Sequence, residues 1–245
     1  CDRLQVSSAS VRRPRVILDA SSSVVITASR RIYAEQLHYA NICDLPVLLE
    51  GPAAVGKTAL VQALCTQANG GKLYRVNNTQ TTTIEDYLGC QMPDGCGGFE
   101  YQDGELIKAM KSGGWFLADE FNLADPNIMS MLSPLLEGQG SLLLEGERES
   151  IKADPRFRFF ATQNDSNYAG RNKLPPTLRA RFLEMQVHSF EKEDILEILE
   201  TRIREESTSL AREQAELIAA VYAAMRSNVS GSSQISLTMR EIAKW

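Results

Sequence analysis

The sequence predicts an α/β fold, with a five-stranded parallel sheet between helices and a smaller helical region after it. Two observations support this prediction. Between residues 46 and 187, short apolar runs typical of strands alternate with amphipathic patterns typical of helices, and such alternation indicates a parallel sheet with helices on both faces. From Phe190 onward the strand signals stop, and only helical patterns remain.

The strands follow in order from apolar runs bounded by turn residues. We expect them at residues 46–50, 73–76, 115–118, 157–164 and 182–187. The third run, at 115–118, contains no polar residue, as expected of a central strand that is covered on both faces. Glycines between 91 and 101 and turn residues between 142 and 151 predict two hairpins inserted into the domain.

Helical patterns fill the intervals between these strands. We expect helices over 30–41, 57–67, 81–88, 105–111, 125–137 and 175–181, and then over 193–203, 211–225 and 237–245. Asp125-Pro126 is typical of a helix start, because Asp caps the first turn and Pro fits its first position. Pro134 should kink or shorten that helix. We divide the chain into an N-terminal extension or linker at 1–28, a core at 29–189 and a helical lid at 190–245.

The segment after the first strand fits the phosphate-binding pattern G-x-x-x-x-G-K-S/T at every fixed position. Its residues are Gly51, Pro52, Ala53, Ala54, Val55, Gly56, Lys57 and Thr58. Glycines at both ends let backbone N–H groups point at an anion, at the positive end of the following helix. Lys57 adds a cation for the terminal phosphates, and the Thr58 hydroxyl is suited to ligate Mg²⁺. The sequence therefore predicts a P-loop NTPase.

Two strand ends supply further polar groups for such a site. Asp119 and Glu120 directly follow the apolar run at 115–118. The first can support the metal, and the second can orient and deprotonate an attacking water. Asn164 ends the strand at 157–164 and could hold that water from the opposite side. An isolated acidic pair is often a solvated turn, so this prediction depends on the position of the pair after a buried strand, downstream of the phosphate loop.

Composition argues against other classes of function. The chain has 245 residues, 43% of them hydrophobic, which is enough for a substantial core. A formal net charge of −5 gives no broad basic surface for nucleic acid, and Arg12, Arg13 and Arg15 fit a solvated linker better than a nucleic-acid patch. No apolar run approaches membrane-spanning length. We therefore expect no direct nucleic-acid site and no membrane partner.

The five cysteines, an odd number, favour a reducing intracellular compartment over a disulfide framework. Cys90 and Cys96 flank a glycine-rich turn, but both histidines are far away in the sequence, which disfavours a zinc site. Residues 19–23 match the D-x-S-x-S spacing of a metal-ion-dependent adhesion site. We favour a serine-rich turn there, because an adhesion site needs further ligands from a whole domain.

The motifs together resemble the AAA+ ATPases, and more narrowly the midasin-like, dynein-related branch that includes MoxR proteins. The resemblance covers residues 45–187 closely and the lid loosely. Beyond the phosphate loop and the acidic pair, it rests on LLEGP at 48–52, VNN at 76–78, DEFNLA at 119–124, FATQN at 160–164, GR at 170–171 and RARFLE at 179–184. Midasin-like proteins carry such modules in tandem, and we expect this chain to be a fragment of a longer protein.

The resemblance implies a role for each residue of the predicted site. The phosphate-binding residues would hold ATP, and Thr58 and Asp119 would support Mg²⁺. Glu120 would be the catalytic base, and Asn164 would be the first sensor of the bound nucleotide. The reaction that this set implies is hydrolysis of ATP to ADP and phosphate.

Two arginines complete the set that the resemblance implies. Arg181 matches the arginine finger, which in this family acts on the nucleotide of the neighbouring module, and Arg179 is the weaker candidate. Arg240 matches an arginine of the lid that reaches the γ-phosphate. The implied assembly is a hexameric or pseudo-hexameric ring of AAA+ modules, so an isolated module should hydrolyse ATP slowly.

The family also implies a biological setting. Midasin-like proteins remodel precursors of the large ribosomal subunit and strip their assembly factors in the nucleus, which suggests those partners and a nuclear location. Two alternatives stay open: a non-catalytic module that holds nucleotide as a structural element of a concatenated ring, and a GTP-preferring relative of MoxR or restriction type. The presence of Glu120 and Arg181 favours catalysis, because a site that only holds nucleotide and does not hydrolyse it has no use for a catalytic base. No residue in the sequence fixes the base-binding pocket.

Overall fold

The computed structural model describes residues 25–69, 72–143, 150–164 and 174–206, together with Leu217 and Ala220, which are both helical. Nearly all of the predicted N-terminal extension lies outside the described residues, as does the segment at 19–23. The predicted helix at 237–245 and Arg240 also lie outside them.

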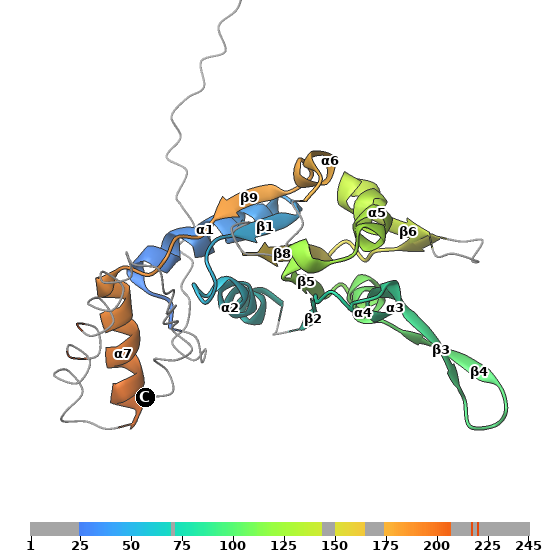
Figure 1. Cartoon of the computed structure of the whole chain (residues 1–245), viewed down its shortest axis with the longest axis horizontal. Coiled ribbons are helices and arrows are strands. Elements are labelled where there is room, and N and C mark those ends of the chain that lie inside the picture. The colour runs from blue at the N-terminus through green and yellow to red at the C-terminus, as the bar shows by residue number, and fades with distance from the viewer. Residues whose placement is uncertain are drawn as a thin grey trace, which may run out of the picture.

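Five strands form one parallel sheet, as the sequence predicts. In spatial order they are β2 (Leu73–Asn77), β5 (Trp115–Asp119), β8 (Arg158–Gln163), β1 (Val47–Glu50) and β9 (Leu183–Gln186). Every pairing between neighbouring strands is parallel. All the carboxyl ends therefore meet at one edge of the sheet, and those of β5, β8 and β1 are adjacent at its centre (Figure 1).

Helices cover both faces of this sheet. On one face lie α1 (Ala28–Ile42) and α2 (Lys57–Asn69), and on the other lie α3 (Ile84–Leu88), α4 (Glu105–Ser112) and α5 (Pro126–Pro134). A single 3₁₀ turn, η1 (Phe121–Leu123), follows β5, and a short helix, α6 (Pro176–Arg179), precedes β9. The order of elements is the alternation of strand and helix that the sequence predicts.

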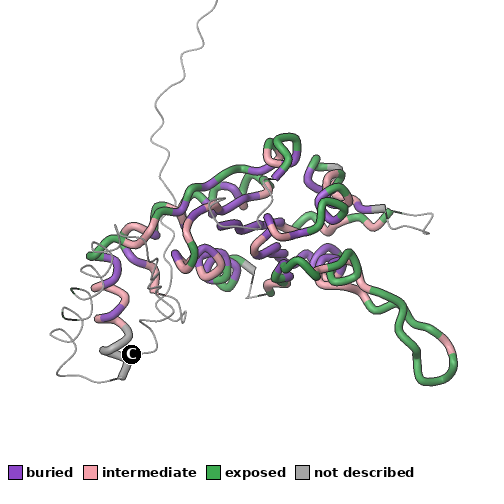
Figure 2. Tube along the Cα trace, viewed as in Figure 1, coloured by how far each residue is buried: buried purple, intermediate pink, exposed green. Residues whose placement is uncertain are grey.

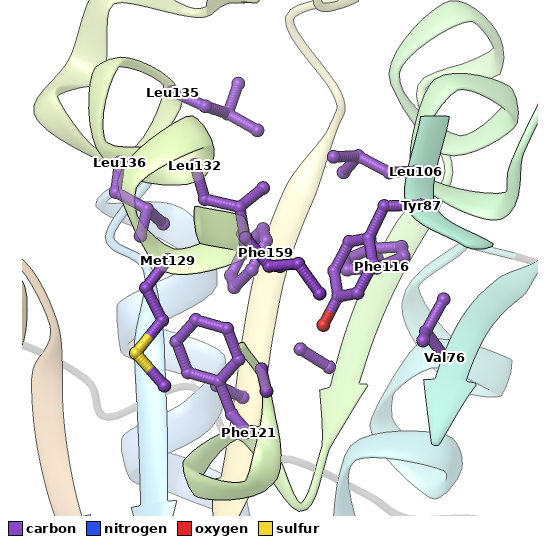
Figure 3. Close-up of a cluster of buried hydrophobic side chains, with 14 of the residues drawn as sticks. Val76, Tyr87, Leu106, Phe116, Phe121, Met129, Leu132, Leu135, Leu136 and Phe159 are labelled. Atoms are coloured by element: carbon purple, nitrogen blue, oxygen red, sulfur yellow. The ribbon is translucent and has the colours of Figure 1, made fainter. Parts of the chain in front are cut away.

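The side chains of β5 alternate between two hydrophobic cores. Trp115 and Leu117 pack with α1 and α2, whereas Phe116 and Ala118 belong to the core under α3, α4 and α5, because successive side chains of a strand point to opposite faces. Figure 3 shows the second core, in which the rings of Phe116 and Tyr87 pack with centroids 5.6 Å apart. Every residue of β5 is buried, so the end of this strand is held firmly at the centre of the sheet.

The helix after β5 begins and ends as the sequence predicts. The Asp125 carboxylate accepts the Asn127 backbone N–H at 2.7 Å, and Pro126 occupies the first helical position. The α-helix ends at Pro134, and a π-helical turn, η2 (Leu135–Gln139), follows it. Proline at this position lacks the N–H that would continue the α-helical hydrogen bonding.

Both predicted hairpins are present and project from the body of the domain (Figure 1). They pair β3 (Gly89–Pro93) with β4 (Phe99–Asp103) and β6 (Ser141–Leu143) with β7 (Ser150–Lys152). Figure 2 shows that the β3–β4 hairpin is exposed along most of its length. The preceding helix begins at Ile84 and not at residue 81, because the Asp86 carboxylate accepts the Thr83 N–H at 2.8 Å and caps the helix there.

After β9 the chain leaves the sheet and continues into α7 (Lys192–Glu206). Arg30 of α1 holds the connecting segment, because its guanidinium donates to the His188 carbonyl oxygen at 2.7 Å and lies 4.1 Å from the centre of the Phe190 ring. The Glu197 carboxylate accepts the Ala28 N–H at 3.1 Å, so α7 is tied to the start of α1. Among the described residues, no helix combines the length and the apolar character that crossing a bilayer requires.

Candidate functional site

The predicted site residues lie where the three central strands end. β1 leads into the loop at residues 51–56, β5 ends at Asp119, and Asn164 directly follows β8. Because β5, β8 and β1 are neighbours in a parallel sheet, polar groups from three distant parts of the sequence meet at one place.

The loop at residues 51–56 joins β1 to α2 through a tight turn. Ala54 and Gly56 have positive φ angles of 61° and 83°. A Cβ atom at Gly51 would lie 2.1 Å from the Val187 carbonyl oxygen, so only glycine allows the loop to pass this close to the chain after β9. Within the loop, Val55 is buried, Pro52 and Ala54 are half-buried, and Ala53 is exposed. α2 begins directly after the loop, and the N-terminal end of a helix favours an anion because the helix dipole is positive there.

The Lys57 ammonium group is surrounded by oxygen acceptors. Its Nζ donates to the carbonyl oxygens of Gly51 and Pro52 at 2.8 and 2.7 Å, and to Asn164 Oδ1 at 2.8 Å. Lys57 is 7% exposed. The charge is therefore held at the mouth of the loop, where the terminal phosphates of a bound nucleotide would lie.

The Asp119 carboxylate is buried and accepts hydrogen bonds from three side chains. The Thr58 hydroxyl lies 3.0 and 3.1 Å from its two oxygens. The Thr162 hydroxyl donates to Oδ1, and the Arg75 guanidinium forms an ion pair with Oδ2. The structure thus brings together Thr58 and Asp119, the two residues that the sequence predicts to support a metal ion.

Glu120 and Asn164 are also in direct contact. The backbone of Glu120 is left-handed, with φ 52° and ψ 44°, a conformation that is uncommon for residues other than glycine and often occurs at functional sites. Its N–H donates to the Thr162 hydroxyl at 3.1 Å. The Asn164 Nδ2 donates to Glu120 Oε1, while Asn164 Oδ1 accepts from Lys57. Asn164 therefore bridges the loop lysine and the second acid of the pair.

These groups surround a cavity of about 710 Å³. Its size is within the range of small-molecule binding sites. The lining comes from the phosphate loop, the start of α2 and the ends of the strands: Ala54, Val55, Gly56, Lys57, Thr58, Ala59, Arg75, Asn77, Asn78, Thr79, Asp119, Glu120, Leu123 and Asn164. A cavity lined both by the loop that the sequence predicts to bind phosphate and by two carboxylates is suited to a metal-bound phosphate ester.

Three residues that were not predicted from the sequence, Arg75, Thr162 and Asn78, also belong to this site. The N–H and the side-chain amide of Asn78 both donate to the Asp119 carbonyl oxygen, at 2.9 and 2.8 Å, and the buried Tyr87 hydroxyl donates to Asn78 Oδ1 at 2.8 Å. Each of the three is a polar residue within or directly after a strand of the central sheet. That pattern is the signal that could have identified them.

The two candidate arginine fingers are both engaged in ion pairs within the chain. Arg181 pairs with Glu137, and its Nε donates to the Thr177 carbonyl oxygen at 3.2 Å. Arg179 lies between Glu184 and Glu50, at 2.7 and 2.6 Å, and these contacts raise the pKa of Arg179 and lower that of Glu184. Within the described part of the chain, neither arginine lines the cavity.

A family model for the AAA domain (dynein-related subfamily) matches residues 46–182. Midasin of Giardia intestinalis is 36% identical over 184 residues, which cover 74% of this chain and 4% of that protein. Midasin of Dictyostelium discoideum is 31% identical over 207 residues, covering 82% of this chain and 3% of that protein. The chain therefore spans only a small part of the length of these relatives.

A solved structure supports the same fold. The crystal structure of a Cytophaga hutchinsonii protein superposes with a TM-score of 0.59 at 22% identity, covering 79% of this chain and 59% of that one. At this identity the likeness concerns the fold alone. The family match, by contrast, extends over more than half of the 245 residues. The chain belongs to the dynein-related subfamily of AAA domains.

Proposed function

We propose that this chain is an ATP-binding and ATP-hydrolysing module of a ring-forming AAA+ motor. One observation carries the proposal: side chains from the phosphate loop, the end of β5 and the end of β8 are joined by hydrogen bonds around a single cavity. Membership in the AAA family implies nucleotide binding. The contact between Asn164 and Glu120 adds a carboxylate suited to general-base catalysis.

The donor set fits a magnesium nucleotide. The Thr58 hydroxyl and the Asp119 carboxylate, 3.0 Å apart, are hard oxygen ligands of the kind that Mg²⁺ prefers. When bound, Mg²⁺ would supply positive charge that offsets the negative charge of the phosphates. Lys57 contacts neutral carbonyl oxygens of the loop, and charged phosphate oxygens are stronger acceptors for an ammonium group than carbonyl oxygens are.

In the proposed reaction Glu120 is the general base. Its carboxylate removes a proton from a water molecule whose oxygen forms the new bond to the γ-phosphorus. The bond between the γ-phosphorus and the bridging oxygen breaks, and ADP and phosphate result. Lys57 stabilises the negative charge on the phosphates, and Asn164 orients Glu120 relative to Lys57, because it contacts both. A positioned general base contributes about 10²–10⁴-fold to the rate.

We propose that the Glu120→Gln variant separates catalysis from binding. The amide keeps the shape of the side chain but does not accept the proton, so ATP hydrolysis should fall by about 10²–10⁴-fold while nucleotide binding is retained. Glu100→Gln, on the exposed strand β4, is the matched control and should hydrolyse ATP at the wild-type rate. If Glu120→Gln hydrolyses ATP at the wild-type rate, Glu120 is not the base. Bound nucleotide that wild type never turns over would indicate a structural module instead.

Arg181 is proposed to act on the nucleotide of a neighbouring module. Arg181 is not among the residues that line the cavity of its own chain, which supports this role, and an arginine finger contributes about 10³–10⁵-fold to the rate. A mixture of Glu120→Gln chains with Arg181→Ala chains tests the idea, because a mixed ring contains sites with an intact base and a neighbour's intact arginine. Hydrolysis above the sum of the two separate variants supports action in trans. A mixture that only adds the two rates contradicts it, and Arg179→Ala in place of Arg181→Ala is the control.

The wider setting is proposed from the two midasin relatives, of which this chain spans 3% to 4%. We propose that the module works within a hexameric or pseudo-hexameric ring on pre-ribosomal large-subunit particles and their assembly factors in the nucleus. Residues 29–189 would form the nucleotide-binding core, and residues 190–245 would form the lid, from which Arg240 would reach the γ-phosphate. Association of the tagged whole protein with large-subunit precursors, lost on nucleotide depletion, would test this setting.

A further inference from the structure

Arg75 contacts the carboxylate that the proposed function assigns to the metal ion. It lies on β2, the edge strand, opposite Leu117 of β5. Its guanidinium pairs with Asp119 Oδ2, the oxygen that also lies 3.1 Å from the Thr58 hydroxyl. The Asp119 side chain is 8% exposed, whereas that of Arg75 is 45% exposed. A partly solvated cation thus reaches in from the sheet edge and neutralises a buried anion.

The position of Arg75 brings it into competition with a metal ion. Mg²⁺ bound by Thr58 would interact with the same Asp119 carboxylate, and two cations beside one carboxylate repel each other. Without any cation, the partners that the described residues still offer the buried Asp119 carboxylate are the hydroxyls of Thr58 and Thr162. A buried carboxylate is costly without an opposite charge. One cation at Asp119 is therefore favourable, and two together are not.

A second cavity provides a place to which the Arg75 side chain can move. This cavity, of about 470 Å³, shares Arg75, Asn77 and Thr79 with the larger one. Its remaining lining includes the acidic residues Asp86 and Glu105, whose carboxylates already accept from the Thr83 N–H and the Lys108 ammonium, together with two threonines that carry hydroxyls. Both kinds of group accept hydrogen bonds from a guanidinium. The side chain can therefore leave Asp119 without losing all of its partners.

We propose that Arg75 is a positioning residue that exchanges with the metal ion at Asp119. In the nucleotide-free chain it holds the carboxylate, and on binding of a magnesium nucleotide it moves to the adjacent cavity that Asp86 and Glu105 line. Two consequences follow. Arg75 raises the concentration of Mg²⁺ needed to support nucleotide binding, and it strengthens nucleotide binding when Mg²⁺ is absent, because it offsets the charge of Asp119. This inference rests on the proposed function, since it concerns the same nucleotide site.

Binding of a fluorescent ADP derivative to the whole chain, in a Mg²⁺ titration and in EDTA, tests the exchange without any dependence on turnover. Arg75→Ala should lower the Mg²⁺ concentration for half-maximal binding and weaken binding in EDTA, each by about fivefold, the lower end of typical coupling between two ligands. Arg75→Gln keeps a hydrogen-bond donor without the charge and should change both quantities in the same directions. Arg156→Ala removes an exposed ion pair with Asp154 that is not part of either cavity and should match wild type.

The outcomes separate this inference from the proposed function. If wild type binds the nucleotide and both Arg75 variants bind it with the same Mg²⁺ dependence as wild type, the proposed exchange of Arg75 with the metal ion is wrong. The nucleotide site itself is then still supported. If the Arg75 variants bind the nucleotide more weakly by the same factor with and without Mg²⁺, the exchange is also refuted, because a merely structural role of Arg75 predicts that result. If wild type binds no nucleotide at any Mg²⁺ concentration, the proposed function fails, and the exchange fails with it.

Discussion

Removal of one buried hydroxyl group, by Tyr87→Phe, tests whether the support beneath the acid pair is as tight as the structure indicates. The Tyr87 hydroxyl is fully buried and donates to Asn78 Oδ1 at 2.8 Å. Asn78 in turn holds the Asp119 carbonyl oxygen through its N–H and its side-chain amide. Burial raises the pKa of Tyr87, so the phenol stays protonated and keeps donating through neutral pH.

The magnitude follows from the burial of both partners. Phenylalanine preserves the ring, so the packing against Phe116 is kept, but Asn78 Oδ1 loses its donor at a position where Asn78 is only 1% exposed. A buried acceptor that loses its partner costs about 1–3 kcal/mol. Tyr101→Phe is the matched control: its hydroxyl donates to the Leu88 carbonyl oxygen at 3.1 Å, but the residue is 43% exposed. Water can replace that bond, so the change should stay within about 0.5 kcal/mol.

Urea unfolding of wild type and both variants, followed by circular dichroism and tryptophan fluorescence, measures the difference. The expected result is a clear loss of unfolding free energy for Tyr87→Phe and almost none for Tyr101→Phe, with similar denaturant slopes. If the two variants unfold at the same urea concentration, the hydroxyl of Tyr87 does not support the site, and the reasoning from burial is refuted.

Two further predictions concern the loop and the core. Gly51→Ala should weaken ATP binding and destabilise the chain by about 1–3 kcal/mol, because the new Cβ would lie 2.1 Å from the Val187 carbonyl oxygen. A variant with the affinity for ATP and the melting temperature of wild type would show that the loop is not packed this tightly. Cys65 is fully buried, and burial raises its pKa from 9.0 to about 12, so iodoacetamide should label it only after unfolding, unlike the exposed Cys43 and Cys90. The fold therefore favours the neutral thiol, so the free energy of unfolding should fall as the pH rises from about 9 toward 12. A Cys65→Ala variant should lack that part of the pH dependence.

Much of this fold could be predicted because its signals are local. The run at 115–118 is apolar throughout, and this identified a central strand whose residues are all buried. The carboxyl ends of parallel strands share one edge, so a strand end at Asp119 and another at Asn164 were expected near the phosphate loop. The Asp125 cap and the effect of Pro134 on its helix depend only on the residues beside them, and the structure confirms both.

The unpredicted contacts depend on which strands are neighbours, and the sequence does not contain that information in a local form. Arg75 reaches Asp119 only because β2 pairs with β5 in a register that places Asn77 opposite Asp119. The pairing of Arg181 with Glu137 likewise depends on the position of the π-helical turn after Pro134, which contains Glu137. Local patterns predicted the elements and the candidate site residues at the strand ends, whereas the charge partners of these residues depend on the arrangement of the sheet.

Isothermal titration calorimetry of the chain with ATP in the presence of Mg²⁺ tests the central claim most directly. We predict saturable binding at one site per chain, weakened at least about tenfold by Lys57→Ala, because hydrogen bonds to charged groups contribute roughly 1.5–3 kcal/mol. Lys111→Ala, which removes an exposed ion pair with Asp103, should bind ATP as wild type does. No saturable heat from wild type, or equal affinity in the Lys57 and Lys111 variants, would contradict the assignment of this cavity to a nucleotide.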